Sequence, residues 1–185
     1  ITKSLLVLSN STQYFPTQLC CAGDPVQIGI PPAAEGTVSY SWSPTTGLSN
    51  STISNPYASP TTTTTYQLLI SDGICSDTIY QTVEVVDIDI DLPPQIVVCE
   101  GEELLYTPTI SASHDNLFYY WSNNPNFTTL LNSDFSDPSL QITSSWGSGT
   151  LYLKVVSEPC EVIVSIPFID STVEYGDPGQ FVSCF

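Results

Sequence analysis

Six cysteines are the residues of this chain whose chemistry is most open to prediction. They are Cys20, Cys21, Cys75, Cys99, Cys160 and Cys184. No two of them have the Cys-x-x-Cys spacing of a zinc site, and the single histidine, His114, lies far from every cysteine in the sequence. Disulfides are therefore the better prediction, and because disulfides persist in oxidising compartments, we expect an extracellular or cell-surface protein.

Acidic residues are the second group that could do chemistry. Asp87, Asp89 and Asp91 alternate along the chain, so in an extended strand their side chains project to one side. Together with Glu102 they could hold a Ca²⁺ ion, which prefers carboxylate oxygens. The alternative is an exposed acidic edge that keeps the strand from pairing with other chains. No other cofactor is expected.

Catalytic groups are poorly represented. His114 and Asp115 stand near several serines, but the Gly-x-Ser-x-Gly nucleophile elbow is missing from the sequence. Glu102 and Glu103 are adjacent, so on a strand they would point to opposite faces and could not flank one glycosidic bond. We predict no enzymatic activity.

Three further side chains are candidates for surface contacts. Asn50-Ser-Thr and Asn126-Phe-Thr fit the N-glycan acceptor pattern. Trp146, in Ser-Ser-Trp-Gly-Ser-Gly, is expected in a loop and is the candidate contact residue, for example toward surface glycans. Trp42 and Trp121 alternate with other apolar residues, so they are predicted to lie in a core.

Charge narrows the class of partner. The 185 residues include 19 acidic and two basic residues, for a net charge of −17. This charge repels phosphate backbones and anionic lipid, so neither nucleic-acid binding nor membrane-surface binding is expected. The apolar runs are far too short to span a bilayer, and no membrane insertion is predicted.

An internal repeat organises the chain. Cys21-Ala-Gly is matched by Cys99-Glu-Gly, and about twenty residues later an alternating apolar triplet ends in Trp42 or Trp121. A second cysteine follows in each copy, at Cys75 and Cys160. Short β-branched and aromatic runs separated by Pro, Gly, Ser and Thr predict strands rather than helices. The fold class is therefore all-β, with two tandem immunoglobulin-like β-sandwich modules.

The repeat also suggests module boundaries. Residues 19–90 and 91–170 are expected to form the two sandwiches. Residues 1–18 are expected to be the last strand of a preceding module with a linker, and residues 171–185 the start of a following one. The chain is thus expected to be a segment of a longer array.

The disulfide pairing is inferred from the repeat alone. We expect one internal bridge in each module, Cys21–Cys75 and Cys99–Cys160, each contributing about 4 kcal/mol by constraining the unfolded chain. Cys184 would pair outside the chain. Cys20 is left without an assigned partner: it could join a preceding module, Cys184 or another chain, or remain a thiol.

The first copy resembles a known repeat family. Ser-Tyr-Ser-Trp-Ser-Pro-Thr-Thr-Gly-Leu-Ser at 39–49, Asn-Pro-Tyr-Ala-Ser-Pro-Thr at 55–61 and Asp-Gly-Ile-Cys at 72–75 are similar to the PKD-like repeats of large Bacteroidota surface proteins. The second copy keeps the cysteines and the tryptophan but lacks the Ser-Pro-Thr-Thr-Gly-Leu signature. The resemblance implies a seven-stranded sandwich, type IX secretion, and O-glycosylation at Thr78 and Ser171.

The expected function follows from these points. We predict a non-catalytic structural or adhesive segment of a giant surface protein or filament, used for attachment, gliding or prey capture. Its expected partners are neighbouring repeats, further copies in a filament, and surface glycans. The alternatives are an accessory module of a secreted hydrolase and a filament subunit that exchanges strands.

Overall fold

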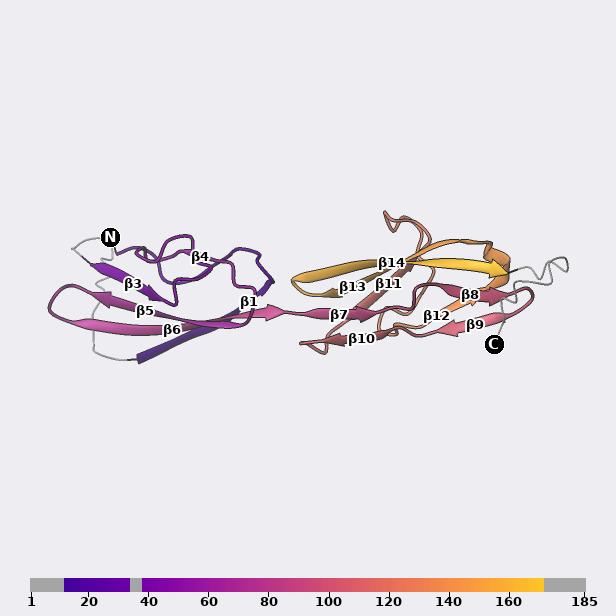
Figure 1. The fold of residues 1–185 in the computed structure, drawn as a ribbon. Coiled ribbons are helices and arrows are strands. Elements are labelled where there is room, and N and C mark those ends of the chain that lie inside the picture. Colours follow the sequence, from indigo (N-terminus) through magenta and orange to yellow (C-terminus); the bar gives the residue numbers. More distant parts are fainter. Residues whose placement is uncertain (1–11, 34–37, 172–185) are drawn as a thin grey trace. The chain divides into compact units, whose positions relative to one another are not determined.

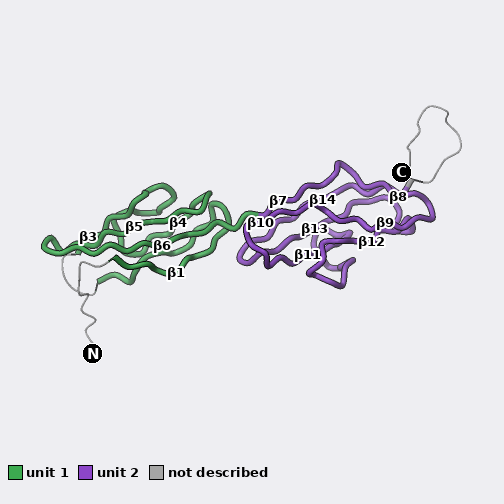
Figure 2. Tube along the Cα trace, turned by 90° about the horizontal axis from the view of Figure 1, so that it is seen from below, with its two compact units in different colours: residues 1–87 green, residues 88–185 purple. Residues whose placement is uncertain are grey.

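The computed structural model describes residues 12–33 and 38–171 (Figure 1). The chain divides into two units, residues 1–87 and 88–185 (Figure 2). The described residues form strands, turns and loops, with one 3₁₀ turn, η1 (Ser144–Trp146). The prediction of an all-β fold with two tandem modules is confirmed.

Six strands lie in the described residues of the first unit, 12–33 and 38–87. These are β1 (Thr12–Cys21), β2 (Val26–Gln27), β3 (Ser39–Ser43), β4 (Tyr57–Ala58), β5 (Thr64–Ser71) and β6 (Ser76–Val86). Four of them form a sheet in the order β1-β6-β5-β3, and β2 pairs with β4. β5 and β6 are an antiparallel hairpin, whereas β1 runs parallel to β6.

The second unit repeats this arrangement. Its strands are β7 (Ile88–Asp91), β8 (Ile96–Cys99), β9 (Glu103–Tyr106), β10 (Thr109–Ala112), β11 (Phe118–Ser122), β12 (Leu140–Thr143), β13 (Gly149–Ser157) and β14 (Cys160–Ser171). The four-stranded sheet has the order β11-β13-β14-β8, with β8 parallel to β14. β12 pairs with β9, and β10 pairs with β7.

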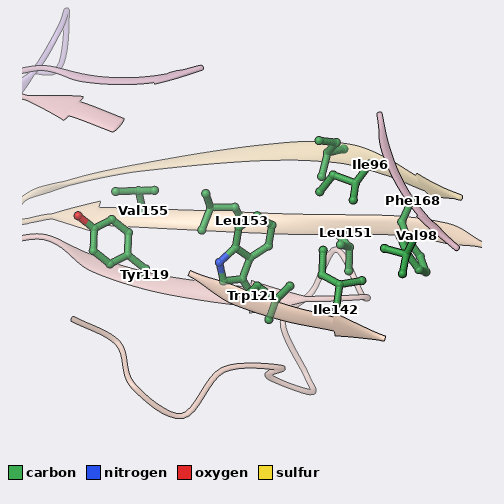
Figure 3. Close-up of a cluster of buried hydrophobic side chains, with 11 residues drawn as sticks. Ile96, Val98, Tyr119, Trp121, Ile142, Leu151, Leu153, Val155 and Phe168 are labelled. Carbon is green, nitrogen blue, oxygen red and sulfur yellow. The ribbon is translucent and has the colours of Figure 1, made fainter. Parts of the chain in front are cut away.

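Each unit has its own core, and each core contains one of the predicted tryptophans. Trp42 of β3 is 2% exposed and lies opposite Leu68, whereas Trp121 of β11 is 0% exposed and lies opposite Leu153. Each indole N–H donates to a backbone carbonyl 2.8 Å away, that of Ile53 or Pro138. Figure 3 shows Trp121 among the buried side chains of the second core. The predicted core position of both tryptophans is confirmed.

Alternation along the strands produces these cores. In β6 every second residue from Asp77 to Val85 is buried, and β13 shows the same period from Leu151 to Ser157. The second core also takes Leu140 and Ile142 from β12, so it joins the four-stranded sheet to the β9–β12 pair. Burial of one face of each sheet is what makes the pattern visible in the sequence.

The structure corrects the expected start of the first module. β1 pairs with β6 from Thr12 onward, with Gln13 opposite Ile79 and Cys20 opposite Val85. Residues 12–18 therefore belong to the first module and not to the last strand of a preceding one. Residues 1–11 and 172–185 lie outside the described part. The division between the units falls after Asp87, where the sequence placed it after residue 90.

Candidate functional site

The two repeated cysteines of the first module lie at opposite ends of its sheet. Cys21 ends β1 and is paired in register with Val86, the last residue of β6. Cys75 directly precedes β6 and is therefore eleven residues before Val86. At about 3.3 Å per residue the two cysteines are about 36 Å apart along the strand. A disulfide requires Cα atoms within about 7 Å, so Cys21 and Cys75 cannot bond.

The second module has the same geometry. Cys99 ends β8 opposite Ser171, and Cys160 begins β14, again eleven residues earlier. Cys75 is thus the structural equivalent of Cys160, and Cys21 that of Cys99. A bond between Cys99 and Cys160 is excluded by the same distance of about 36 Å.

Both predicted internal disulfides are therefore wrong. Cys75 is an exposed thiol. Cys21, Cys99 and Cys160 are each disulfide-bonded, but the sheet register shows that none of them bonds the other repeated cysteine of its own module. The repeat revealed which cysteines are equivalent. It did not reveal that a strand of eleven residues separates them.

Cys20 is a thiol of a different kind. It points into the first core, is 4% exposed and is not disulfide-bonded. Burial raises the pKa of its thiol, and the negative charge of Asp24 raises it further. A high pKa keeps little of the thiol in the reactive thiolate form, so Cys20 behaves as a small apolar core residue.

The tip of the β5–β6 hairpin holds Cys75 in a defined position. One carboxylate oxygen of Asp72 accepts hydrogen bonds from the backbone N–H groups of Ile74 (2.9 Å) and Cys75 (2.8 Å). The Ser71 hydroxyl donates to the carbonyl of Cys75 at 3.1 Å. The hydrogen bonds that Asp72 accepts lower the pKa of its carboxyl group, and the one from the Cys75 N–H has the largest effect. Ile74, next to the thiol, is 93% exposed.

The predicted calcium ligands are not brought together. Asp89 and Asp91 lie in β7, opposite Ser111 and Thr109 of β10. Glu102 lies in the turn after Cys99, the last residue of β8. Asp87 precedes β7. Across residues 12–33 and 38–171, no three His, Cys, Asp or Glu side chains are grouped so that they could hold a metal ion. We therefore propose no calcium site.

The other candidate residues occupy varied positions. Asn50 and Asn126 are exposed, and the Asn50 side chain accepts hydrogen bonds from the N–H and the hydroxyl of Thr52, both at 2.8 Å. Thr78 is partly buried within β6, and Ser171 ends β14. Glycosylation at any of these positions stays a prediction.

Trp146 lies in η1 and is 41% exposed. Its ring meets that of Phe168 edge to face at 6.5 Å, so one part of the indole is packed and the other is accessible. His114 lies 3.0 Å from the Ser113 hydroxyl. These positions leave Trp146 a candidate contact residue, and the absence of catalysis remains a prediction.

Within the described part of the chain, no helix has the length and apolar character needed to cross a membrane.

Comparison with known proteins gives matches at the level of fold only. No protein-family model matches the chain. No curated protein matches it either. Solved structures with a similar fold include extracellular domains 3–5 of Drosophila OTK, at 12% identity and a TM-score of 0.51, covering 87% of this chain and 60% of that one. The I-band fragment I67–I69 of titin matches at 12% identity and a TM-score of 0.50, covering 85% of this chain and 62% of that one.

The chain thus spans about three fifths of the length of these two structures. Both are tandems of immunoglobulin-like domains. At 12% identity the likeness shows the fold and nothing further. This protein is a tandem of immunoglobulin-like β-sandwiches.

Proposed function

We propose that the chain is a non-catalytic structural and adhesive segment of an extracellular tandem-repeat protein, in which the sandwiches act as mechanical links in series. One observation carries this proposal. In each module the strand that leads the chain into the four-stranded sheet is the parallel neighbour of the strand that leads it out. These neighbours are β1 and β6 in the first module, and β8 and β14 in the second.

This topology determines how a stretching force acts. A pull on the two ends of a module draws β1 toward its start and β6 toward its end, so the parallel strands are sheared past one another. In shear, the hydrogen bonds between the strands lie across the force and are loaded together. If the strands were instead peeled apart, the bonds would break one at a time. The arrangement suits a domain that must hold its length under load.

The finer assignment rests on the sequence signature. The Ser-Pro-Thr-Thr-Gly-Leu segment at 43–48 supports a PKD-like repeat of a giant Bacteroidota surface protein, exported by type IX secretion and used for attachment, gliding or prey capture. Neighbouring repeats are its first partners, with self-assembly into filaments and binding of surface glycans as further roles. The net charge of −17 favours repeats that stay apart and solvated.

Stretching single molecules by their two ends tests the mechanical proposal. Under reducing conditions we expect two unfolding events, one from each module, at forces well above those of a module that is peeled apart. Each event should lengthen the chain by about 3.5 Å per residue released.

The exposed thiol of Cys75 supplies a matched control. Thr12, at the start of β1, lies opposite Thr78, close to the hairpin tip that carries Cys75. A handle on Cys75 and a second handle at the N-terminus therefore peel β1 from β6 instead of shearing it. We expect the first module to open at a several-fold lower force in this geometry. Equal forces in the two geometries would contradict the proposed mechanical role.

An accessory module of a secreted hydrolase is the second candidate, and the same fold would serve it. The number of modules in the parent protein separates the two: a long array favours a stalk, and one to three modules beside a catalytic domain favour the hydrolase. Strand exchange is less favoured for residues 12–21, because β1 is already paired within its own module.

A further inference from the structure

We infer that Cys75 is the attachment point of a disulfide between modules, and that its partner is a cysteine at the Cys99 position of a preceding module of the same design. This inference rests on the proposed role of the chain as part of a tandem array. It concerns a thiol that the sequence assigned to an internal bridge and that the structure leaves exposed.

The second module supplies the first argument. Cys160 stands at the same place as Cys75, eleven residues before the end of the last strand, at the start of that strand's hairpin. Cys160 is disulfide-bonded, and the sheet register shows that its bond does not go to Cys99. A cysteine at this position therefore forms a disulfide that leaves its own sheet. Cys75 occupies the same position in the first module, and its distance from Cys21 likewise excludes a disulfide between the two.

The hairpin tip supplies the second argument. Cys75 is exposed beside Ile74, an isoleucine that is 93% exposed. Two hydrogen bonds to Asp72 and one from Ser71 nevertheless hold the backbone around the thiol. The tip therefore presents the thiol to solvent from a backbone held by hydrogen bonds, where a cysteine of another module can reach it. Cys20, the other thiol among the described cysteines, is buried and does not compete.

Chain direction identifies the partner. β1 starts at the end of the module that carries Cys75, because Thr12 is opposite Thr78, and β6 leaves at the end that carries Cys21, because Cys21 is opposite Val86. In a series of such modules the chain leaves one module at its Cys21-type end and enters the next at its Cys75-type end. The cysteine offered to Cys75 by a preceding module is therefore one of the Cys21 and Cys99 type. Cys99 itself is disulfide-bonded, so this position is also competent to form a bridge.

Thiol–disulfide exchange with a small-molecule disulfide such as oxidised glutathione would form the bond. The Cys75 thiolate attacks one sulfur of that disulfide, forming a mixed disulfide and releasing one glutathione thiol. The thiolate of the partner cysteine then attacks the Cys75 sulfur and releases the second glutathione thiol. Two protein thiols are oxidised and one glutathione disulfide is reduced, so electrons and protons balance.

A tandem chain tests the inference. The test protein joins residues 1–172 of one copy to residues 10–185 of a second. When the modules are aligned by Cys21 and Cys99, residue 10 is equivalent to Ile88. One residue therefore separates the modules at the new joint, as one residue separates Val86 from Ile88. After equilibration in a glutathione buffer, exposed thiols are alkylated with a maleimide, and disulfides are mapped by non-reducing digestion and mass spectrometry. We expect Cys75 of the second copy to be protected and joined to Cys99 of the first.

The first copy is the internal control. Its Cys75 has no preceding module and should remain fully alkylated, so labelling of Cys75 should fall by half relative to two separate chains. Cys75→Ser in the second copy should leave the Cys75 of the first copy labelled and should remove the bond to Cys99 from the disulfide map. Cys75→Ser in the first copy should abolish Cys75 labelling.

Several outcomes would overturn the inference. These are full alkylation of both Cys75 residues, a bond between Cys75 residues of two chains, or a bond from Cys75 to Cys20. The separate 185-residue chain is treated in the same buffer as a further control. Disulfide-linked dimers of this chain would show that Cys75 pairs with a second chain and needs no covalently joined preceding module. The stretching experiment is done under reducing conditions, so failure of the bridge and failure of the mechanical role can be told apart.

Discussion

At the residue scale, each module depends on one tryptophan that is buried between its strands and held by one hydrogen bond. Trp42 and Trp121 occupy equivalent places, and each indole N–H reaches a carbonyl outside the four-stranded sheet. Burial of the large apolar ring stabilises the module, and the hydrogen bond of the indole N–H fixes the orientation of the ring. The sequence identified both tryptophans because they alternate with other apolar residues.

Trp121→Ala should lower the free energy of unfolding of its module by about 3–5 kcal/mol, because it leaves a large cavity and an unpaired carbonyl at Pro138. Trp146→Ala is the matched control, and a change below about 1 kcal/mol is expected because its ring is 41% exposed. Urea denaturation followed by circular dichroism measures both. Similar losses for the two variants would contradict the assigned core.

Gly29→Ala should be far more damaging than Gly73→Ala. Both glycines have positive φ, +92° and +89°, so both variants carry backbone strain of about 1–2 kcal/mol. A Cβ on Gly29 would also clash with the Ser54 carbonyl oxygen and lie 2.9 Å from the Trp42 ring, whereas a Cβ on Gly73 meets nothing within 4 Å. Melting temperatures of the two variants check this. Equal shifts would show that the loop around Gly29 relaxes.

At the scale of elements, the two hairpins that end in Cys75 and Cys160 are the most informative parts of the fold. Each connects the last two strands of its sheet, and each places a cysteine at the end opposite the other repeated cysteine. In the first hairpin a carboxylate, Asp72, organises the turn by accepting backbone hydrogen bonds. We therefore expect that turn to be sensitive to acid.

The pKa of Asp72 is lowered in the folded chain, so its contribution to the turn is fully present above the ordinary aspartate pKa of about 3.9 and is lost as the pH falls through the lower folded value. We expect the protection of the Ile74 and Cys75 amides from hydrogen exchange to decrease below about pH 4. Asp72→Asn, which keeps the acceptor oxygen and removes the charge, should show no change over this range. A pH-independent protection in the parent chain would contradict the role of the carboxylate.

At the scale of the whole molecule, two cores with no residue in common define two modules. The buried cluster of the first unit contains Trp42, and that of the second contains Trp121. A cooperative unfolding unit generally corresponds to one contiguous core. The modules should therefore lose their structure as separate units.

Calorimetry of Trp42→Ala and Trp121→Ala tests this separation. Each variant should shift one unfolding transition downward, by about 10 °C or more for a loss of 3 kcal/mol in a domain of this size, and leave the other in place. The comparison is best made with disulfides reduced, so that cross-links do not couple the transitions. If either variant shifts both transitions equally, the modules unfold as one.

Much of this architecture could be predicted from the sequence, because it follows from local patterns. Strands with one buried face show a period of two, and this pattern marked the strands around Trp42 and Trp121 and the repeat itself. The number of cysteines and their spacing indicated disulfides and not zinc. These inferences need only neighbouring residues, since burial on one face of a strand recurs every second position.

Only the tertiary structure decided the roles of the cysteines, the acidic residues and β1. Which cysteines can meet depends on strand register, and the parallel pairing of Cys21 with Val86 places Cys75 a strand length away. The β1–β6 pairing also assigned Thr12 to the first module. In the second module, the β7–β10 pairing placed Asp89 opposite Ser111, whereas Glu102 follows the end of β8. Order along a chain shows which residues are equivalent, but the distance between them is established only when strands far apart in sequence form their hydrogen bonds.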